Sequence, residues 1–161
     1  MKNSKKNVPL YVDLDGTVIK TDLMFESLVL LLKKNILYVF AIIFWLIKGR
    51  AHLKFELARK TDLSASDLPL NLEFYKYLEG QRENGREIVL ISASNQKAVE
   101  VVGEHLGLFD ATYGSDKFIN LKAEQKLQKI SELSGGRDFA YAGNSADDLI
   151  IWRSAAQVII V

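Results

Sequence analysis

Short apolar runs alternate along the chain with longer segments in which apolar residues recur every three or four positions. A short run bounded by turn residues indicates a buried strand, whereas spacing of three or four indicates an amphipathic helix. Strands that alternate with helices predict βαβ units and a parallel sheet, so the expected fold class is α/β. The predicted strands cover residues 8–12, 87–92, 111–113, 138–142 and 157–161.

The predicted helices fall into two groups, one in direct succession after the first strand and one spread among the later strands. Thr21 or Asp22 is a suitable N-cap for the first helix, and Asn84-Gly85 ends the helix that precedes the second strand. The residues of that helix expected to face inward are Leu72, Tyr75, Tyr77 and Leu78. The predicted helices cover residues 23–34, 36–48, 50–60, 72–83, 96–105, 122–133 and 146–153.

The successive helices divide the chain into an α/β core of residues 1–19 and 72–161 and an all-helical insertion of residues 20–71. Within the insertion, residues 36–47 form an uninterrupted apolar run. The run is too short to cross a bilayer, which needs roughly 20 apolar residues. It predicts either a helix buried in the insertion or a helix that lies on a membrane or contacts a partner. The basic residues that flank it are Lys33, Lys34, Lys48 and Arg50.

Composition narrows the possible function classes. With 48% hydrophobic and 25% charged residues, the 161-residue chain has the composition of a folded globular domain. Its net charge of +1 gives no indication of a nucleic-acid partner. Because cysteine is absent, the chain has no disulfide, thiol nucleophile or thiolate zinc site. Lys2, Lys5 and Lys6 are expected to form a solvated stretch that can lie near anionic lipid.

Two carboxylates, Asp13 and Asp15, end the first predicted strand and are followed by Gly16 and Thr17. In open α/β sheets, ligands bind beyond the carboxyl ends of the strands. The two aspartates project to the same side if the extended geometry continues. Close carboxylates repel unless a cation relieves them, and Mg²⁺ is usually held by carboxylates together with substrate phosphate oxygens. The alternative is a strand that ends in an Asp-Gly turn without chemistry.

The sequence Asp13-Leu14-Asp15-Gly16-Thr17 resembles the first motif of the haloacid dehalogenase (HAD) superfamily. The resemblance implies a Rossmann-like HAD fold, in which helices flank a parallel sheet, with a small all-helical cap insertion. It implies that Asp13 is the nucleophile that forms an aspartyl-phosphate and that Asp15 is the general acid/base. It also implies that Asp13 and the main-chain carbonyl of Asp15 bind Mg²⁺, while Thr17 offers a hydroxyl to the phosphate.

The second and third motifs of the superfamily have candidates further along the chain. Ser92 and Ala93 follow the second predicted strand, where the superfamily keeps a Ser or Thr that hydrogen-bonds the transferring phosphoryl group. The third motif is a lysine that neutralises the phosphoryl oxygens. Lys126 fits this position best, because apolar neighbours give its helix a buried side, and Lys122 is the second candidate. Taken alone, such a serine is more often a helix cap and such a lysine a solvated side chain.

The fourth motif departs from the family pattern. The superfamily normally has Gly-Asp followed by a second Asp one turn later, and these supply metal ligands. Here Asn144 stands in the position of the first carboxylate, and Asp148 matches the second. The implied metal ligands are therefore Asp13, Asp15, Asn144 and Asp148. An amide oxygen can bind Mg²⁺ but carries no charge, so we expect weaker metal binding, with Asp147 as a further acidic neighbour.

Longer stretches of the sequence resemble a narrower group of proteins within the HAD superfamily. Asn-Leu-Lys-Ala-Glu-Gln-Lys at 120–126 and Tyr-Ala-Gly-Asn-Ser-Ala-Asp-Asp-Leu at 141–149 are similar to the HAD-type domain in front of UbiA-type polyprenyl-phosphate transferases in bacterial two-domain proteins. This resemblance implies a piece of a longer membrane protein, located in the cytoplasm at the inner face of the membrane. It also implies a fused prenyltransferase domain as a partner for residues 36–47.

We therefore expect a Mg²⁺-dependent phosphomonoester hydrolase that works through an aspartyl-phosphate. The expected substrate is a polyprenyl-linked phosphoribose or another small phosphate ester. Transfer of the phosphoryl group to a hydroxyl instead of water would use the same residues. The alternative function is a non-catalytic domain that docks on a membrane or partner, which the apolar run and Asn144 both motivate.

Overall fold

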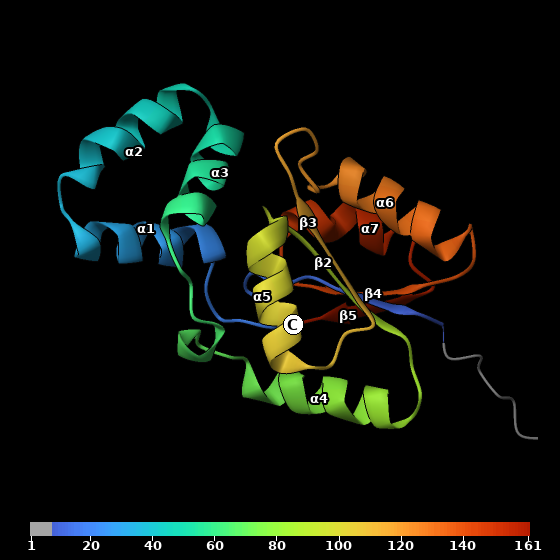
Figure 1. The fold of residues 1–161 in the computed structure, drawn as a ribbon. Helices are drawn as coiled ribbons and strands as arrows, with labels where there is room; N and C mark the ends of the chain where they lie inside the picture. The colour runs from blue at the N-terminus through green and yellow to red at the C-terminus, as the bar shows by residue number, and fades with distance from the viewer. Residues whose placement is uncertain (1–7) are drawn as a thin grey trace, which may run out of the picture.

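A computed structural model describes residues 8–161, so Lys2, Lys5 and Lys6 lie outside the described part of the chain. All the strands run parallel in one twisted sheet with the order β3-β2-β1-β4-β5 (Figure 1). Their bounds are β1 Leu10–Val12, β2 Ile88–Asn95, β3 Ala111–Ser115, β4 Ala140–Gly143 and β5 Gln157–Ile160. The predicted α/β class, a parallel sheet flanked by helices, is confirmed.

The central strands are buried on both faces, as expected for a parallel sheet covered by helices. In β1, Leu10 and Val12 contribute to one apolar cluster, whereas Tyr11 contributes to the cluster on the opposite face. The same alternation continues in β2, where Leu90 and Ile91 belong to opposite clusters. A period of two along the strands therefore divides the core into two layers.

Helices cover each face of the sheet. The layer that contains Leu10 is closed by Phe74 of α4 and Val99 of α5, and the layer that contains Tyr11 is closed by Ile130 of α6 and Ile151 of α7. Figure 1 shows α4 and α5 on the side away from α6 and α7. The bounds of these helices are α4 Leu72–Glu83, α5 Gln96–Leu106, α6 Glu124–Ser134 and α7 Leu149–Trp152.

Three helices lie between β1 and α4 and project from the sheet at the upper left of Figure 1. They share a small apolar cluster of their own, built on Leu31, Leu53 and Leu57. The Asp22 carboxylate caps the first of them by accepting from the backbone amides of Met24 and Phe25. The bounds are α1 Leu23–Lys34, α2 Tyr38–Ile47 and α3 Arg50–Lys60, followed by a short 3₁₀ turn at Ala65–Asp67.

Of the two alternatives predicted for the 36–47 run, burial in the insertion is wrong, because α2 has no buried residue. The inward face predicted for α4 is wrong in one position as well. Leu72 is exposed at the start of the helix, and Phe74 takes its place in the core. No helix among residues 8–161 is long and apolar enough to cross a membrane.

The last two predicted helices differ from prediction at their N-terminal ends. Ala123 has a φ of 47°, in the left-handed region, so α6 begins at Glu124 rather than at Lys122. The segment predicted as one helix from residue 146 begins instead as a 3₁₀ turn over Ala146–Asp148 and becomes α-helical only in α7. In that turn, Ser145 and Asp148 satisfy each other's backbone amides in a capping box.

Candidate active site

The chain segments that carry the predicted motifs meet at the carboxyl end of the sheet. Asp13 follows β1 directly, and its backbone amide donates to the Ala142 carbonyl of β4 at 2.9 Å. On the other side of β1, Ser92 lies within β2. Asn144 follows the end of β4. Because β1 lies between β2 and β4, parallel pairing brings all three strand ends to one edge.

Lys126 is the buried cation of this edge. Its Nζ donates to Asp13 Oδ1 at 2.7 Å and to the Tyr141 hydroxyl at 3.1 Å, and it lies 3.8 Å from Asp148 Oδ1. Lys122, the second lysine candidate, instead forms a half-exposed ion pair with Asp147 at 3.0 Å. The geometry therefore favours Lys126 over Lys122 as the cation beside the predicted nucleophile.

The Asp13 carboxylate is buried but reachable from the pocket. Burial raises the pKa of Asp13 to about 6, and the adjacent Lys126 ammonium opposes that rise. Oδ1 is occupied by Lys126, whereas no hydrogen bond from residues 8–161 reaches Oδ2. Asp13 also lines a pocket at this end of the sheet. One carboxylate oxygen is therefore held by a cation while the other remains available for chemistry.

Asp148 lies behind this pair and is almost fully buried. Its Oδ1 accepts from the Tyr141 hydroxyl at 2.6 Å, and its Oδ2 accepts from the backbone amides of Asn144 and Ser145 at 3.1 and 3.0 Å. Direct binding of a metal by Asp148 would require some of these bonds to break. In this arrangement the carboxylate holds the loop after β4 and orients Tyr141 towards Lys126.

Asp15 is turned towards the start of α1. Its Oδ1 accepts from the backbone amide of Leu23 at 2.8 Å, and its Oδ2 accepts from the hydroxyls of Ser94 at 2.6 Å and Ser92 at 3.1 Å. Burial raises the pKa of Asp15, and these hydrogen bonds oppose the rise. Ser92 is fully buried, whereas Ser94 and Ala93 line the pocket.

Gly16 and Thr17 pack closely against Asn144, which lines the pocket. The Thr17 hydroxyl donates to Asn144 Oδ1 at 3.4 Å, and Thr17 itself is buried. Gly16 has a φ of 74°, and a Cβ at this position would lie 2.1 Å from Asn144 Nδ2. The glycine is therefore required both by its backbone conformation and by the closeness of the Asn144 side chain.

Gly16→Ala is expected to lower the free energy of unfolding by about 2 kcal/mol and to displace Asn144, because alanine strains the left-handed backbone and collides with the amide. Chemical denaturation measures the change. Gly80→Ala is the matched control: Gly80 lies inside α4, and a Cβ added there would meet nothing within 4 Å, so we expect a small stabilisation. Equal effects of both substitutions would contradict the packing argument.

The pocket above these groups has a volume of about 280 Å³ and is closed on one side by the helical insertion. Arg50 and Lys54, one turn apart on α3, line it together with Met24 of α1. Lys54 Nζ donates to the Ala93 carbonyl at 2.8 Å, so this contact joins the insertion to the end of β2. Burial lowers the pKa of Lys54, and the nearby Asp15 charge opposes that change.

Several of these residues were not identified from the sequence. Tyr141 is buried between Lys126 and Asp148, and its only sequence signal is its position in the apolar strand that leads to Gly143. Burial raises the pKa of Tyr141 well above its ordinary value, as do the neighbouring carboxylates, so it acts as a neutral hydrogen-bond donor. Arg50 and Lys54 are basic residues four positions apart, a spacing that places both on one face of α3.

The oxygens at this edge fit a hard divalent cation. Asp13, Asp15 and Asn144 all line the pocket, and carboxylate, carbonyl and amide oxygens are ligands that Mg²⁺ accepts. Residues 8–161 contain no cluster of three or more acidic, histidine or cysteine side chains with the geometry of a metal site. A cation here would therefore depend on few protein carboxylates and on oxygens of the bound substrate.

Comparison with known proteins gives one curated relative. The uncharacterized protein y4nM of Sinorhizobium fredii is 36% identical over 156 residues, which cover 97% of this chain but 30% of that protein. The chain thus spans less than a third of the length of the relative that it matches. No family model matches the sequence.

Solved structures share the fold. A HAD family hydrolase from Salmonella enterica serovar Typhi superposes with a TM-score of 0.64 at 14% identity, covering 92% of this chain and 61% of that one. A phosphoserine phosphatase, solved as a phospho-aspartyl intermediate analogue, superposes with a TM-score of 0.61 at 17% identity, covering 97% and 87%. The chain therefore has the Rossmann-like α/β fold of HAD hydrolases.

Proposed function

We propose that this protein is a phosphomonoester hydrolase that uses Asp13 as its nucleophile and requires Mg²⁺. The observation that carries the proposal is the Asp13 carboxylate itself, held by Lys126 at 2.7 Å through one oxygen and open to the pocket through the other. The fold shared with a phosphoserine phosphatase, solved as a phospho-aspartyl analogue, supports the same reaction class.

In the proposed reaction, Asp13 Oδ2 attacks phosphorus and forms an acyl-phosphate while the bond to the leaving oxygen breaks. Asp15 donates a proton to that oxygen and then removes one from the water that hydrolyses the acyl-phosphate. Before this transfer Asp15 must release its hydrogen bonds to Ser92 and Ser94. The Lys126 ammonium offsets negative charge on the nucleophile and on the transferred group.

The residues expected to hold Mg²⁺ are Asp13, the main-chain carbonyl of Asp15, and Asn144, with Asp148 oriented behind them. The ion would neutralise charge between the carboxylate and the phosphate when bound. Around the phosphate we place Ser92, Ala93 and Thr17, of which Ala93 lines the pocket.

We propose a lipid-linked phosphate ester as the substrate, with polyprenyl-linked phosphoribose as the specific candidate and other small phosphate esters as alternatives. The sequence resemblance to domains fused to prenyltransferases supports this choice. The chain matches 30% of the S. fredii protein, so the rest of that relative is long enough to contain a further domain. We place the reaction at the cytoplasmic face of the membrane.

The test is phosphate release from a panel of phosphate esters, with Mg²⁺ and with a chelator. We expect turnover that the chelator removes and that renewed Mg²⁺ restores. Absence of turnover with every ester, lipid-linked esters included, would instead support a non-catalytic docking domain. The specific observation that favours this second function is the uncharged Asn144 at the lip of the pocket.

Asn144→Asp is expected to increase apparent Mg²⁺ affinity by roughly tenfold or more, because it adds a negative charge beside Asp13 and Asp15. The rate as a function of Mg²⁺ concentration and calorimetric titration of Mg²⁺ both measure this. Ser145→Asp provides a neighbouring control that adds the same charge at the next position. A larger effect at Ser145, or none at Asn144, would show that residue 144 is not at the metal site.

A further inference from the structure

The side of α2 that faces away from the protein is apolar along its length. Tyr38, Ile42 and Trp45, at helical spacing, pack on the apolar cluster of the insertion. The opposite stripe follows the same spacing and is more than half exposed at every position. Its members are Phe40 at 70%, Ile43 at 52%, Phe44 at 56% and Ile47 at 79% exposed. An exposed contiguous apolar stripe of this kind marks an interaction surface.

A second exposed apolar element lies in the loop between β3 and α6. Phe118 is 83% exposed and Ile119 is 50% exposed. The loop is ordered, because the Asp116 carboxylate accepts from the backbone amides of both residues at 2.7 Å. The turn therefore holds the Phe118 ring outward, away from the core.

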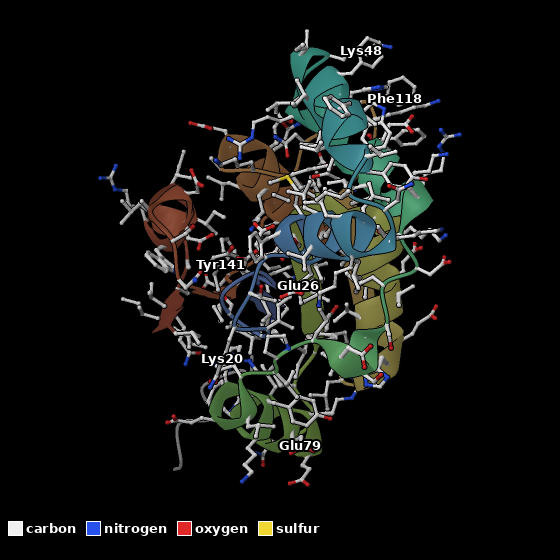
Figure 2. All side chains as sticks on the ribbon, turned by 90° about the vertical axis from the view of Figure 1, so that its left-hand side faces the viewer. Lys20, Glu26, Lys48, Glu79, Phe118 and Tyr141 are labelled. Carbon is white, nitrogen blue, oxygen red and sulfur yellow. The ribbon has the colours of Figure 1, made fainter. Side chains whose placement is uncertain are left out.

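Residues that adjoin both elements in the sequence line the pocket. Arg50, which follows α2, lines one side of the pocket, and Asp116 and Asn120 of the β3–α6 loop line another. Figure 2 places Lys48 and Phe118 at the same end of the molecule, opposite the end that carries Glu79 of α4. The C-terminal end of α2 and the 117–119 loop thus lie at the same end of the molecule (Figure 1 and Figure 2).

The apolar elements are accompanied by positive charge. From residue 27 to residue 55 the sequence contains no aspartate or glutamate. Lys48 Nζ lies 4.5 Å from the centre of the Phe44 ring, and Lys117 Nζ lies 4.9 Å from that of Phe118. The basic residues of the segment are Lys33, Lys34, Lys48, Arg50 and Lys54. The whole chain has a net charge of only +1, so positive charge is concentrated in the segment that contains α2.

We propose that this face, formed by the exposed stripe of α2 and by the 117–119 loop, docks on an anionic lipid bilayer. The Phe44 and Phe118 rings would enter the acyl boundary while the neighbouring amines of Lys48 and Lys117 stay at headgroup depth, which matches the layered polarity of a membrane surface. The ten residues of α2 extend about 15 Å, half the hydrocarbon thickness, so the helix lies in the membrane plane. A second copy is the poorer occupant, because a symmetric contact would bring like charges together.

Docking is independent of the proposed phosphatase reaction and is tested by binding alone. The 161-residue chain is sedimented with vesicles of phosphatidylcholine that contain phosphatidylglycerol, and with vesicles of phosphatidylcholine only. We expect the apparent affinity for the anionic vesicles to be roughly tenfold higher or more, and to fall as salt is raised. Equal affinity for both vesicles, or no binding to either, would overturn the proposal.

The contact residues are tested by substitution. Phe40→Ser combined with Phe44→Ser is expected to weaken vesicle binding by roughly tenfold or more, and Phe118→Ser by a smaller factor. Leu72→Ser is the matched control, because Leu72 is 64% exposed at the start of α4, away from this face. Thermal melting verifies that each variant is folded. Retained vesicle binding in the Phe40/Phe44 variant would contradict membrane docking. So would a parent protein that forms a dimer and does not bind vesicles, if the Phe40/Phe44 substitutions convert that dimer to a monomer.

Discussion

Replacing Asp13 with asparagine is expected to abolish phosphate release while the protein remains folded. The carboxylate oxygen that we propose as the nucleophile is lost, and among residues 8–161 no other carboxylate in the pocket has a buried lysine within hydrogen-bonding distance and a free oxygen. We expect turnover to fall by at least about 1,000-fold, the scale for removal of a covalent nucleophile. The rate of phosphate release measures the loss, and acid-quenched labelling measures the acyl-phosphate.

The fold should tolerate this substitution. Burial raises the pKa of Asp13 to about 6, above its value in the unfolded chain, so at neutral pH the buried charge opposes folding. Asparagine removes that charge but leaves Lys126 without its partner. We expect the opposing effects to leave the free energy of unfolding within about 2 kcal/mol of the parent. Full turnover in folded Asp13→Asn protein would eliminate the proposed mechanism.

Asp15→Asn separates the roles of the two aspartates. Asp15 is proposed to protonate the leaving oxygen and to activate water, so its loss slows both half-reactions but leaves the nucleophile in place. A substrate with a good leaving group requires no proton for the first step. With such a substrate we expect acyl-phosphate to accumulate in Asp15→Asn and to be absent in Asp13→Asn.

The core of the fold was predictable because local and global signals agree there. Strand positions follow from apolar runs such as the one at residues 87–92, and the Asp22 cap marks the start of α1 within one residue. Boundaries failed where a backbone conformation or a side-chain hydrogen bond ended an element. The φ of 47° at Ala123 and the capping box at Ser145 leave no periodic trace in the sequence.

The candidate site was predictable only in part for a related reason. A sequence motif identifies residues at the ends of the first strand and of its neighbouring strands. It does not predict which hydrogen bonds the side chains of these residues form. Asp148 matched a metal-ligand position, yet both its oxygens accept hydrogen bonds from the protein. Lys54 reaches the site from the insertion, and contacts between segments so distant in sequence have no local signature.

The exposure of α2 could also not be predicted from the sequence. A helix that is apolar all round is usually buried, and the sequence alone could not show whether the insertion was large enough to enclose it. The insertion supplies only α1 and α3 as neighbours, and they cover one side. The size of the insertion, rather than the composition of α2, therefore decides which side chains face outward.

Replacing Lys126 with methionine is expected to remove activity and to destabilise the protein in a pH-dependent way. Methionine keeps much of the length but no charge, so Asp13 is left buried without its cation beside Asp148. Breaking a buried ion pair costs about 3–5 kcal/mol, and losing a charged group at the transferred phosphate costs roughly 100-fold or more in rate. Denaturation and phosphate release measure the two effects.

The pH dependence distinguishes loss of charge from loss of packing. Lys126 opposes the burial-driven rise in the pKa of Asp13, so its removal raises that pKa further. The destabilisation is then full at alkaline pH, where Asp13 is charged, and shrinks as pH falls through the folded-state pKa and the carboxyl takes up a proton. Lys129→Met, one turn along α6 with a weak surface ion pair to Glu132, is the control and should change stability by less than about 1 kcal/mol at any pH. A pH-independent loss in Lys126→Met would indicate packing alone, and a greater loss of turnover in Lys122→Met would reassign the catalytic lysine to residue 122.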